Sequence, residues 1–447
     1  MTTPHDRVPR FSRRQALAMG ALGVMTPSLV RAAAPASQTD VVIVGAGAAG
    51  IAAAHVLQAA GVDHLLIEAG SRIGGRAWTE SETFGVPFDH GAHWVQNESR
   101  NPYFERAQQS GYRFCPARDD YRVFADNQEA SAGEVDALWR TWENVEEAIS
   151  QAGENGWDIA PASVAPDSGT WARTAWFGIG PWEMGKDMDA FSCVDWWNSA
   201  GSVDWYCAAG YGALVADRGA GLPVSLETAA TAIRWDGPGV AVETDRGTIR
   251  ARAVIVTVST GVLASGAIAF HPGLPQETLE AFHGIAMGDY NHIALRFGQD
   301  IFAMGEDGFL LHRVDDSMEA FGALTNASGT GIAYCDVGGS FARELEEAGE
   351  AAAIDFVMEK LRAMLGSEVD RSFLGGTATA WSSDPLFRGC YASAAPGAWP
   401  LRQVLREPVG ARIFFAGEAC HPEMWATVGG ADLSGAETAA AVARSLS

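Results

Sequence analysis

The sequence predicts an α/β protein in which two domains are interleaved along the chain. Its 447 residues are too many for one ordinary domain and enough for two that each bury a core. Residues 40–70 read as a buried strand, a glycine-rich turn, a helix and a second buried strand. Residues 411–446 again contain a buried strand and a helix, whereas the chain between has a different character. We therefore expect both ends to share one parallel sheet, with a second domain built from the material between them.

Composition and charge narrow the class of partner. Apolar residues make up 47% of the chain, which indicates a globular protein. The 31 basic and 55 acidic side chains leave a formal net charge of −24. An acidic surface repels nucleic acid and anionic membranes, so neither is an expected partner, and solubility is the simplest reason for the charge.

The first 36 residues have the features of an export signal. Four arginines (Arg7, Arg10, Arg13 and Arg14) precede an apolar run over residues 16–30 and then small residues that offer several A-x-A cleavage sites. The segment "SRRQAL" is similar to a bacterial twin-arginine signal, which predicts a protein of the periplasm or the exterior. An ordinary secretory signal and an uncleaved anchor are the alternatives. No later stretch is long and apolar enough to span a bilayer, so we expect no membrane span in the mature chain.

The cysteines show no pattern that predicts a disulfide framework or a metal site. There are six, and their spacing is irregular: Cys115, Cys193, Cys207, Cys335, Cys390 and Cys420. We expect no structural metal.

A nucleotide-binding turn is predicted near the start of the globular chain. Strands over 41–44 and 65–67 flank a helix over 51–60. In "GAGAAG", Gly45 permits a tight turn, Gly47 lets the backbone approach a pyrophosphate, and Gly50 lets helix and strand pack closely. Glu68 ends the second strand, where a carboxylate accepts hydrogen bonds from ribose hydroxyls and disfavours a 2′-phosphate. The pattern therefore predicts FAD or NAD rather than NADP.

Other elements are visible as periodic patterns. Residues 241–259 predict a hairpin that turns at Arg246-Gly247 and enters a buried strand. Residues 343–364 form the clearest amphipathic helix, and residues 429–446 predict a terminal helix. Nine of the fifteen tryptophans fall between residues 116 and 215. They fit a packed helical core and an aromatic-walled substrate chamber equally well.

The segment after Glu68 separates FAD from NAD. "EAGSRIGGRAW" supplies Arg72, Gly74, Gly75 and Arg76, and it resembles an extension shared by amine oxidases, protoporphyrinogen oxidase and carotenoid desaturases. Its glycines allow close backbone approach, and Arg76 is placed to pair with phosphate. The segment "FDHGAHWV" follows, and its Gly91, Ala92 and Trp94 are similar to the G-A-x-W segment of the same flavoproteins.

Motifs in the last third identify the family more closely. "AFHPGLP" resembles F-x-P-x-L-P, and "TAWSSDPLFRGCY" resembles W-x-x-D-P-x-x-x-G-x-Y through Trp381, Asp384, Pro385, Gly389 and Tyr391. "FFAGEACHPEMWATVGGADLSG" resembles F-A-G-E followed by T-V-x-G-A-x-x-S-G. In order and spacing the chain is similar to the flavin-containing amine oxidases, a family that includes monoamine oxidases, polyamine oxidases and lysine-specific histone demethylases. The resemblance runs from about residue 40 to the end of the chain and is weakest in the tryptophan-rich middle.

The resemblance implies a Rossmann-like FAD-binding domain of the GR2, amine-oxidase type, interleaved with an α+β substrate domain. The expected FAD-binding segments are 38–115, 216–292 and 381–447, the expected substrate segments are 116–215 and 293–380, and residues 1–36 are the export signal.

The resemblance also implies FAD chemistry, in which a hydride passes from the amine-bearing carbon to flavin N5 and water hydrolyses the imine. Glu418, Thr427 and Val428 would lie along the isoalloxazine and ribityl chain. Trp381 would pack near the flavin, and Tyr391 would lie beside the substrate amine.

Two positions depart from the family pattern. His292 stands where the family usually has a lysine that holds a water at flavin N5. A histidine is mostly neutral at pH 7, so we expect slow use of O2 and leave another electron acceptor open; a satisfied core histidine is the alternative. Thr427 replaces the second tyrosine of the monoamine oxidase cage, and Trp425 is a candidate for the missing wall.

Cys390 precedes Tyr391, where monoamine oxidases carry FAD through a thioether. Covalent attachment through Cys390 and a small buried residue are both open.

The predicted function is oxidation of a primary amine or polyamine. An L-amino-acid oxidase or another flavin dehydrogenase or desaturase is one alternative, and a non-catalytic flavin-bound module is another. An amino-acid oxidase needs an arginine for the substrate carboxylate, and Arg173, Arg296 and Arg313 are unassigned. The oligomeric state is open, with a homodimer among the alternatives.

Overall fold

The front of the chain forms the predicted β-α-β unit. In the computed structural model, which describes residues 37–201 and 203–447, β1 (Val41–Val44) is followed by α1 (Ala48–Ala59) and β2 (His64–Ile67). The helix begins three residues before the predicted start, because Ala48 and Ala49 follow the turn at Gly47 directly. The predicted export signal lies outside the described residues.

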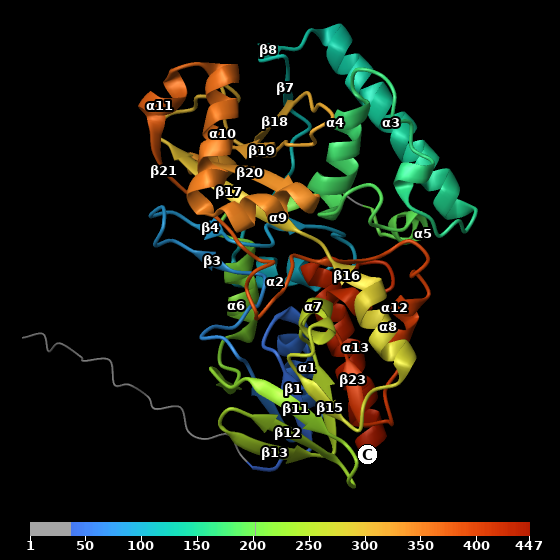
Figure 1. The fold of residues 1–447 in the computed structure, drawn as a ribbon. Helices are drawn as coiled ribbons and strands as arrows, with labels where there is room; N and C mark the ends of the chain where they lie inside the picture. The colour runs from blue at the N-terminus through green and yellow to red at the C-terminus, as the bar shows by residue number, and fades with distance from the viewer. Residues whose placement is uncertain (1–36, 202) are drawn as a thin grey trace, which may run out of the picture. The chain divides into compact units, whose positions relative to one another are not determined.

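A five-stranded parallel sheet collects segments from distant parts of the chain. Its order is β10 (Val224–Ser225), β2, β1, β14 (Ala253–Val256) and β23 (Ile413–Phe415). Helix α13 (Val428–Leu446) lies against α1, and Figure 1 shows this red helix beside the blue start of the chain. The expectation that both ends share one sheet is confirmed.

The predicted hairpin is present in a second, four-stranded sheet. Strand β12 (Val240–Thr244) turns into β13 (Gly247–Ala251), with Thr244 opposite Gly247. The sheet is completed by β11 (Ala230–Arg234) and β15 (Ala269–His271). The nearby helices are α7 (Thr260–Ala264), α8 (Gln276–Gly284) and α12 (Leu401–Arg406).

A seven-stranded sheet forms the centre of the other region. Its order is β21 (Phe373–Ala378), β17 (Tyr290–Phe297), β20 (Ile332–Gly338), β19 (Gly322–Thr325), β18 (Gly308–His312), β7 (Tyr121–Ala125) and β8 (Gln128–Glu129). All pairings are antiparallel except β18 with β7. Because β17 begins at Tyr290, the predicted segment boundary between residues 292 and 293 cuts through a strand and is wrong there.

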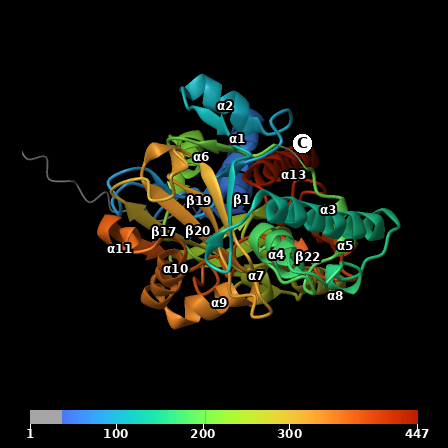
Figure 2. The same cartoon turned by 90° about the horizontal axis from the view of Figure 1, so that it is seen from above.

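The predicted single helix over 343–364 is wrong. The structure has α9 (Gly339–Ala348) and α10 (Glu350–Leu365), separated at Gly349 with φ +95°. The amphipathic pattern continues across the break because both helices bury their apolar residues on the same core. Figure 2 shows α9, α10 and α11 (Glu368–Ser372) on one side of the seven-stranded sheet and α3 (Ala132–Glu154), α4 (Ala172–Phe177) and α5 (Cys193–Trp197) on another.

The tryptophan-rich segment is mainly helical. It contains α3 (Ala132–Glu154), α4 (Ala172–Phe177), a π-helical turn η2 (Gly178–Met184) and α5 (Cys193–Trp197). Trp171 is fully buried among apolar side chains, whereas Trp157 and Trp197 are exposed. The interpretation as a packed core therefore holds for only some of these tryptophans.

The remaining elements are short. They are β3 (Thr79–Glu80), β4 (Phe88–Asp89), β5 (Trp94–Val95), α2 (Pro102–Ser110), β6 (Phe114–Pro116), η1 (Pro161–Ser163), β9 (Trp205–Cys207), α6 (Tyr211–Gly219), β16 (Ile285–Met287), η3 (Ala327–Gly329), β22 (Ala392–Ala394) and η4 (Glu418–Cys420). All six cysteines are free thiols. Within residues 37–201 and 203–447 we find no helix with the length and apolar character needed to cross a membrane.

Candidate functional site

The glycine turn forms a cradle in which side chains cannot be accommodated. A Cβ on Gly50 would lie 1.9 Å from the Gly45 carbonyl oxygen, and Gly45 itself has φ +106°. The second glycine pair closes the cradle: Gly74 donates to the Ala46 carbonyl at 2.9 Å, and a Cβ on Gly75 would lie 3.3 Å from the Gly47 Cα. Two backbone segments therefore approach each other at the carboxyl end of β1 and the start of α1, where a pyrophosphate would be bound.

Glu68 lies at the same end of the sheet, immediately after β2. Its two carboxylate oxygens accept hydrogen bonds from the backbone N–H groups of Ala46 (2.8 Å) and Gly70 (2.7 Å). A carboxylate has room for further donors, so this orientation leaves it able to accept from ribose hydroxyls. The cradle and the fixed carboxylate together fit the adenosine end of FAD.

Arg72 packs beside this cradle. Its guanidinium lies 4.4 Å from the centre of the Trp78 ring and donates to the Gly75 carbonyl at 2.7 Å. Burial lowers its pKa to about 10, so the group keeps its charge at pH 7. Arg72 thus holds the second glycine pair in place while adding a positive charge near the predicted phosphate position.

Arg76 joins the front motif to the back motifs in a way that the sequence did not predict. Its Nη1 donates to the Cys390 carbonyl at 2.6 Å and forms an ion pair with Glu418 Oε1 at 3.0 Å. Glu418 is buried and also accepts from the backbone N–H of Ala426 at 3.0 Å. The expectation that Arg76 stands ready for a phosphate is corrected: its charge is compensated by a buried carboxylate.

The G-A-x-W segment touches the tryptophan of the later motif. A Cβ on Gly91 would lie 2.0 Å from the Arg76 carbonyl oxygen and 2.9 Å from Trp381 Cζ2. Ala92 donates to the same Arg76 carbonyl at 3.1 Å, and Trp381 Nε1 donates to the His90 carbonyl at 3.0 Å. Two motifs almost three hundred residues apart in sequence therefore pack against each other and form one wall of the candidate FAD site.

His292 contacts the same segment through Gly91. The prediction that its imidazole is mostly neutral at pH 7 is wrong. Its Nδ1 lies 2.5 Å from Asp336 Oδ1, and its Nε2 lies 2.8 Å from the Gly91 carbonyl oxygen. Both partners accept hydrogen bonds, so both ring nitrogens must donate, which requires an imidazolium. Burial alone would lower the pKa of His292, but Asp336 and the Gly91 carbonyl outweigh burial and raise the pKa above 6.5.

The consequence is that His292 is a fixed cation in a buried ion pair. Neither ring nitrogen is free to hold a water, which was the role inferred from the family lysine. The expectation of slow O2 use depended on a neutral ring, so it loses its basis.

Tyr391 directly follows Cys390, whose carbonyl accepts from Arg76. Its hydroxyl donates to the Glu183 carbonyl oxygen at 2.9 Å, and its ring lies 5.9 Å from that of Tyr290. Trp425 is instead buried with the α3 and α5 side chains, with the Arg402 guanidinium 5.1 Å over its ring. This placement does not support Trp425 as a cage wall opposite Tyr391.

Glu183 lies in the π-helical turn η2, and its backbone carbonyl accepts the hydrogen bond from the Tyr391 hydroxyl. The residue is exposed by its accessible area. Nevertheless burial, reinforced by Glu146 and Asp204, raises the pKa of Glu183 to about 8. The residue therefore keeps accessible area while the protein around its carboxyl disfavours the charged form.

Thr427 and Val428 lie at the start of α13. Thr427 is the N-cap: its hydroxyl accepts from the Gly430 N–H at 2.9 Å and donates to the Met424 carbonyl at 2.8 Å. Its side chain is therefore occupied with the helix start, and the N–H groups of the first helical turn are the feature that can face a negatively charged ring.

Cys390 is buried between these groups. A Cβ on Gly185 would lie 3.1 Å from Cys390 Sγ and 3.4 Å from the Tyr391 hydroxyl. Burial raises the pKa of the Cys390 thiol, so the reactive thiolate is disfavoured in this environment.

Comparisons with known proteins agree with this geometry. Residues 48–162 and 170–443 match the family model described as flavin containing amine oxidoreductase. The chain belongs to this family. The family match confirms the resemblance found in the sequence, and the protein is a flavin-dependent amine oxidoreductase with a Rossmann-type FAD-binding domain and a substrate domain.

Individual relatives are distant but cover most of the chain. Probable polyamine oxidase 4 of Arabidopsis thaliana is 28% identical, over 89% of this chain and 86% of that protein. Lysine-specific histone demethylase 1 homolog 1 of Oryza sativa subsp. japonica is 28% identical, over 91% of this chain and 52% of that protein. Among solved structures, a putrescine oxidase bound to putrescine has a TM-score of 0.76 at 20% identity, with coverage of 91% and 99%. Cyclohexylamine oxidase from Brevibacterium oxydans IH-35A has a TM-score of 0.76 at 22% identity, with the same coverage.

Sequence reasoning missed two residues of the site, Asp336 and Glu183. Asp336 is a lone acid inside the apolar strand "IAYCDVG", and a charge in such a strand is a signal of a buried partner. Glu183 is an acid within the tryptophan-rich segment, which carries no motif. Its contact with Tyr391 is visible only in the tertiary structure.

Proposed function

We propose that the protein oxidises a primary amine or polyamine that carries a second positive charge. The support for this is Glu183, whose backbone carbonyl accepts from the Tyr391 hydroxyl and whose carboxyl pKa is raised by burial and then by Glu146 and Asp204. A cationic group of the substrate compensates the carboxylate, because an unpaired charge in an enclosed site is costly. A monoamine leaves Glu183 without this partner.

Bound FAD supplies the two-electron acceptor for the hydride from the amine-bearing carbon. Tyr391 orients the reacting amine, and Glu183 binds the distant ammonium and so sets which carbon is presented. The imine product is then hydrolysed by water to an aldehyde and an amine or ammonia. The Arg76–Glu418 and His292–Asp336 pairs hold the segments against which the isoalloxazine would be bound.

Replacing Glu183 by glutamine tests the proposal. We expect the KM for putrescine or spermidine to rise at least tenfold, because a charge-assisted contact of about 1.5–3 kcal/mol is lost. Turnover of n-butylamine should change little. Glu143→Gln, an exposed position on α3, is the matched control. Equal loss with the monoamine and the diamine would contradict the assignment of Glu183.

An L-amino-acid oxidase is disfavoured by the arginines. Arg173 pairs with Asp316 and Arg313 with Asp126 on the surface, and Arg296 donates to the Phe84 carbonyl. None of these three has a described contact with Tyr391, whose hydroxyl instead meets the backbone of the acidic residue Glu183. Anaerobic bleaching of the flavin by leucine or phenylalanine, but not by putrescine, would reverse this preference.

We also propose that FAD is held without a covalent bond. Thioether formation needs the Cys390 sulfur as a nucleophile, and burial raises the pKa of its thiol. Acid precipitation of the holoenzyme should therefore leave a colourless pellet and a yellow supernatant. A yellow pellet that becomes colourless in Cys390→Ser would establish the bond instead.

Export by the twin-arginine route is proposed from residues 1–36 alone. Changing Arg13 and Arg14 to lysine should retain the loaded protein in the cytoplasm of a bacterial host. Unchanged appearance in the periplasm would contradict the route.

A further inference from the structure

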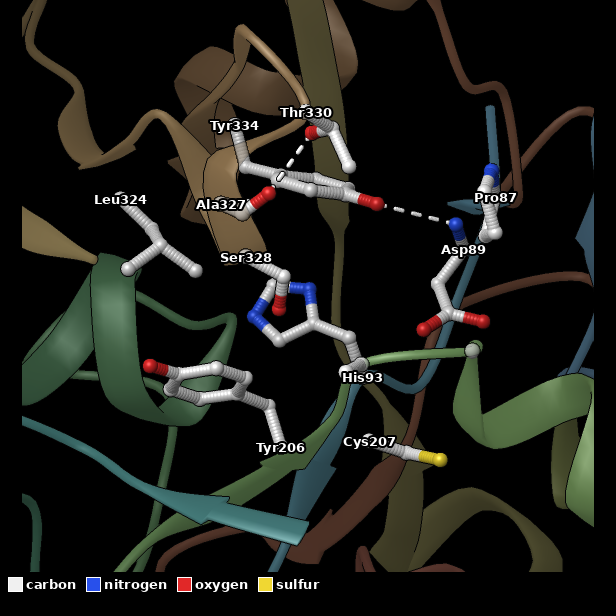
Figure 3. A pocket seen from close by; sticks show the side chains of 12 residues that line it. Pro87, Asp89, His93, Tyr206, Cys207, Leu324, Ala327, Ser328, Thr330 and Tyr334 are labelled. Carbon is white, nitrogen blue, oxygen red and sulfur yellow. Dashed lines mark hydrogen bonds between the residues drawn. The ribbon is translucent and has the colours of Figure 1, made fainter. Parts of the chain in front are cut away.

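A pocket whose lining includes Asp89, His93, Tyr206 and Tyr334 contains a buried polar side chain that has no partner among the described residues. His93 is 4% exposed, and neither of its ring nitrogens has a hydrogen-bond partner among the described residues. Figure 3 shows the His93 ring standing inside the pocket, with Ser328, Tyr206 and Tyr334 around it. A buried imidazole with two unsatisfied nitrogens requires a ligand that both donates and accepts.

The charge of the neighbouring ring decides the state of His93. The rings of His93 and His292 are stacked with centroids 4.9 Å apart and planes inclined by 20°. Since His292 is a cation held by Asp336, a second charge on His93 would be repelled. Burial and the His292 charge lower the pKa of His93 well below its ordinary value, so the ring is neutral. A neutral imidazole presents one N–H donor and one lone pair.

The size and lining of the pocket fit water. Its volume is about 30 Å³, which exceeds the roughly 10–15 Å³ that one water needs. The inner lining is buried and polar, with Asp89, Tyr206 and Tyr334, whereas Ala208 and Ser328 in the outer lining are only half-buried. The pocket therefore has both polar partners for water and an outer end near solvent.

The other polar groups of the pocket do not satisfy His93 themselves. Asp89 accepts from the hydroxyl of Thr79 and from the backbone N–H groups of Tyr211 (3.0 Å) and Gly212 (3.3 Å). The Tyr334 hydroxyl accepts from the Asp89 N–H at 2.9 Å, a contact drawn in Figure 3. These bonds fix the walls and leave the space at the His93 edge for solvent.

We propose that this pocket binds water, and that its waters together with His93 carry protons between solvent and the buried His292–Asp336 pair. The ring of His93 lines the pocket and also stacks on the His292 ring. When the bond from His292 Nε2–H to the Gly91 carbonyl opens, water replaces the carbonyl as acceptor. One proton leaves the imidazolium and one from water takes its place, so the charge of the pair is unchanged.

The first test is the occupancy of the pocket. A high-resolution crystal structure of the holoenzyme should show ordered water within hydrogen-bond distance of both His93 ring nitrogens. His93→Phe removes the donor and the acceptor and should lose these waters. A wild-type pocket without water at either nitrogen would overturn the site.

The second test is proton exchange of His292, followed by NMR on the Nε2 proton that the ring donates to the Gly91 carbonyl. We expect saturation transfer from water in the wild type, and exchange at least tenfold slower in His93→Phe. Ala208→Phe should block the outer end and slow exchange as well. Ala209→Phe, at the next and exposed residue, is the matched control and should leave exchange unchanged.

Unchanged exchange in both His93→Phe and Ala208→Phe would overturn the proton path even if water is present. Both readouts are independent of amine turnover, so the inference stands or falls separately from the proposed substrate.

Discussion

At the scale of single residues, the charge state of His292 follows from its partners and not from its type. A free histidine is mostly neutral at pH 7, and the sequence offers no sign of the carboxylate that changes this. The pairing of β17 with β20 places His292 directly opposite Asp336, and their side chains meet at 2.5 Å. The register of two strands has thereby raised the pKa of a titratable side chain and paired it with a carboxylate.

Asp336→Asn should expose how much stability this pair contributes. Breaking a buried ion pair typically costs about 3–5 kcal/mol, because the remaining charge is left without compensation. The raised pKa of folded His292 means that its contribution is complete below pH 6.5 and is lost as the pH rises through the folded pKa. Urea unfolding should therefore show a larger loss at pH 6 than at pH 9.

The control for this experiment is Asp316→Asn, which removes an exposed ion pair with Arg173. A surface pair contributes about 0–1 kcal/mol, so its loss should be small at both pH values. A pH-independent loss in Asp336→Asn would contradict a charged His292.

Glu183 predicts a specific pH dependence of substrate binding. Its pKa is about 8, so the carboxyl gains its negative charge as the pH rises through that value. The KM for a diamine should fall between pH 7 and pH 9 relative to the KM for n-butylamine, which corrects for titration of the reacting amine. The ratio should become flat in Glu183→Gln. A ratio that is already flat in the wild type would argue against a charge-dependent contact.

At the scale of elements, helix boundaries depend on the backbone more than on the apolar pattern. The run over 343–364 is amphipathic throughout, yet the helix breaks at Gly349, where φ is +95° and ψ is 164°. The packing of both helices on the seven-stranded sheet requires a change of direction there, and glycine is the residue that adopts this conformation without strain.

Gly349→Ala should destabilise the protein through the backbone alone. A Cβ at this position meets no atom within 4 Å, so the cost is the disallowed conformation, roughly 1–3 kcal/mol. Gly133→Ala is the matched control, since it also meets no atom but lies in the helical turn that starts α3. It should stabilise by about 0.4–1 kcal/mol. Equal effects of the two substitutions in urea unfolding would contradict the explanation.

At the scale of the whole molecule, the flavin site exists only when distant segments meet. Helix α1 from the front and α13 from the end pack so closely that a Cβ on Gly435 would lie 2.0 Å from the Ala49 carbonyl oxygen. Arg76 from the front is bonded to Cys390 and Glu418 from the back. We therefore expect the binding of FAD to be coupled to the joining of these segments.

Gly435→Ala should separate the two helices and weaken FAD binding with them. Overpacking against a backbone carbonyl that cannot move costs about 3 kcal/mol. The ratio of flavin to protein absorbance should fall, and the thermal midpoint should recover in part when FAD is added, because ligand binds only the folded state. Glu437→Ala, an exposed position on the same helix, should change neither quantity. Full FAD occupancy in Gly435→Ala would show that the two ends are not coupled.

The sequence by itself determined the elements whose cause is local. The glycines of 45–50 and 74–75, the acid at Glu68 and the apolar runs of β1 and β23 act through backbone freedom, one charge and burial, all of which can be read from neighbouring residues. The ordered motifs of the last third added the family and the cofactor.

Only the tertiary structure decided the states and partners of the side chains. The charge of His292 depends on Asp336, and the partner of Arg76 is Glu418 rather than a phosphate. Glu183 is identified as a candidate site residue only by its contact with Tyr391. Each of these pairs joins residues far apart in the chain. A pKa or an ion pair is set by distance and desolvation in space, and neither quantity is encoded in sequence spacing.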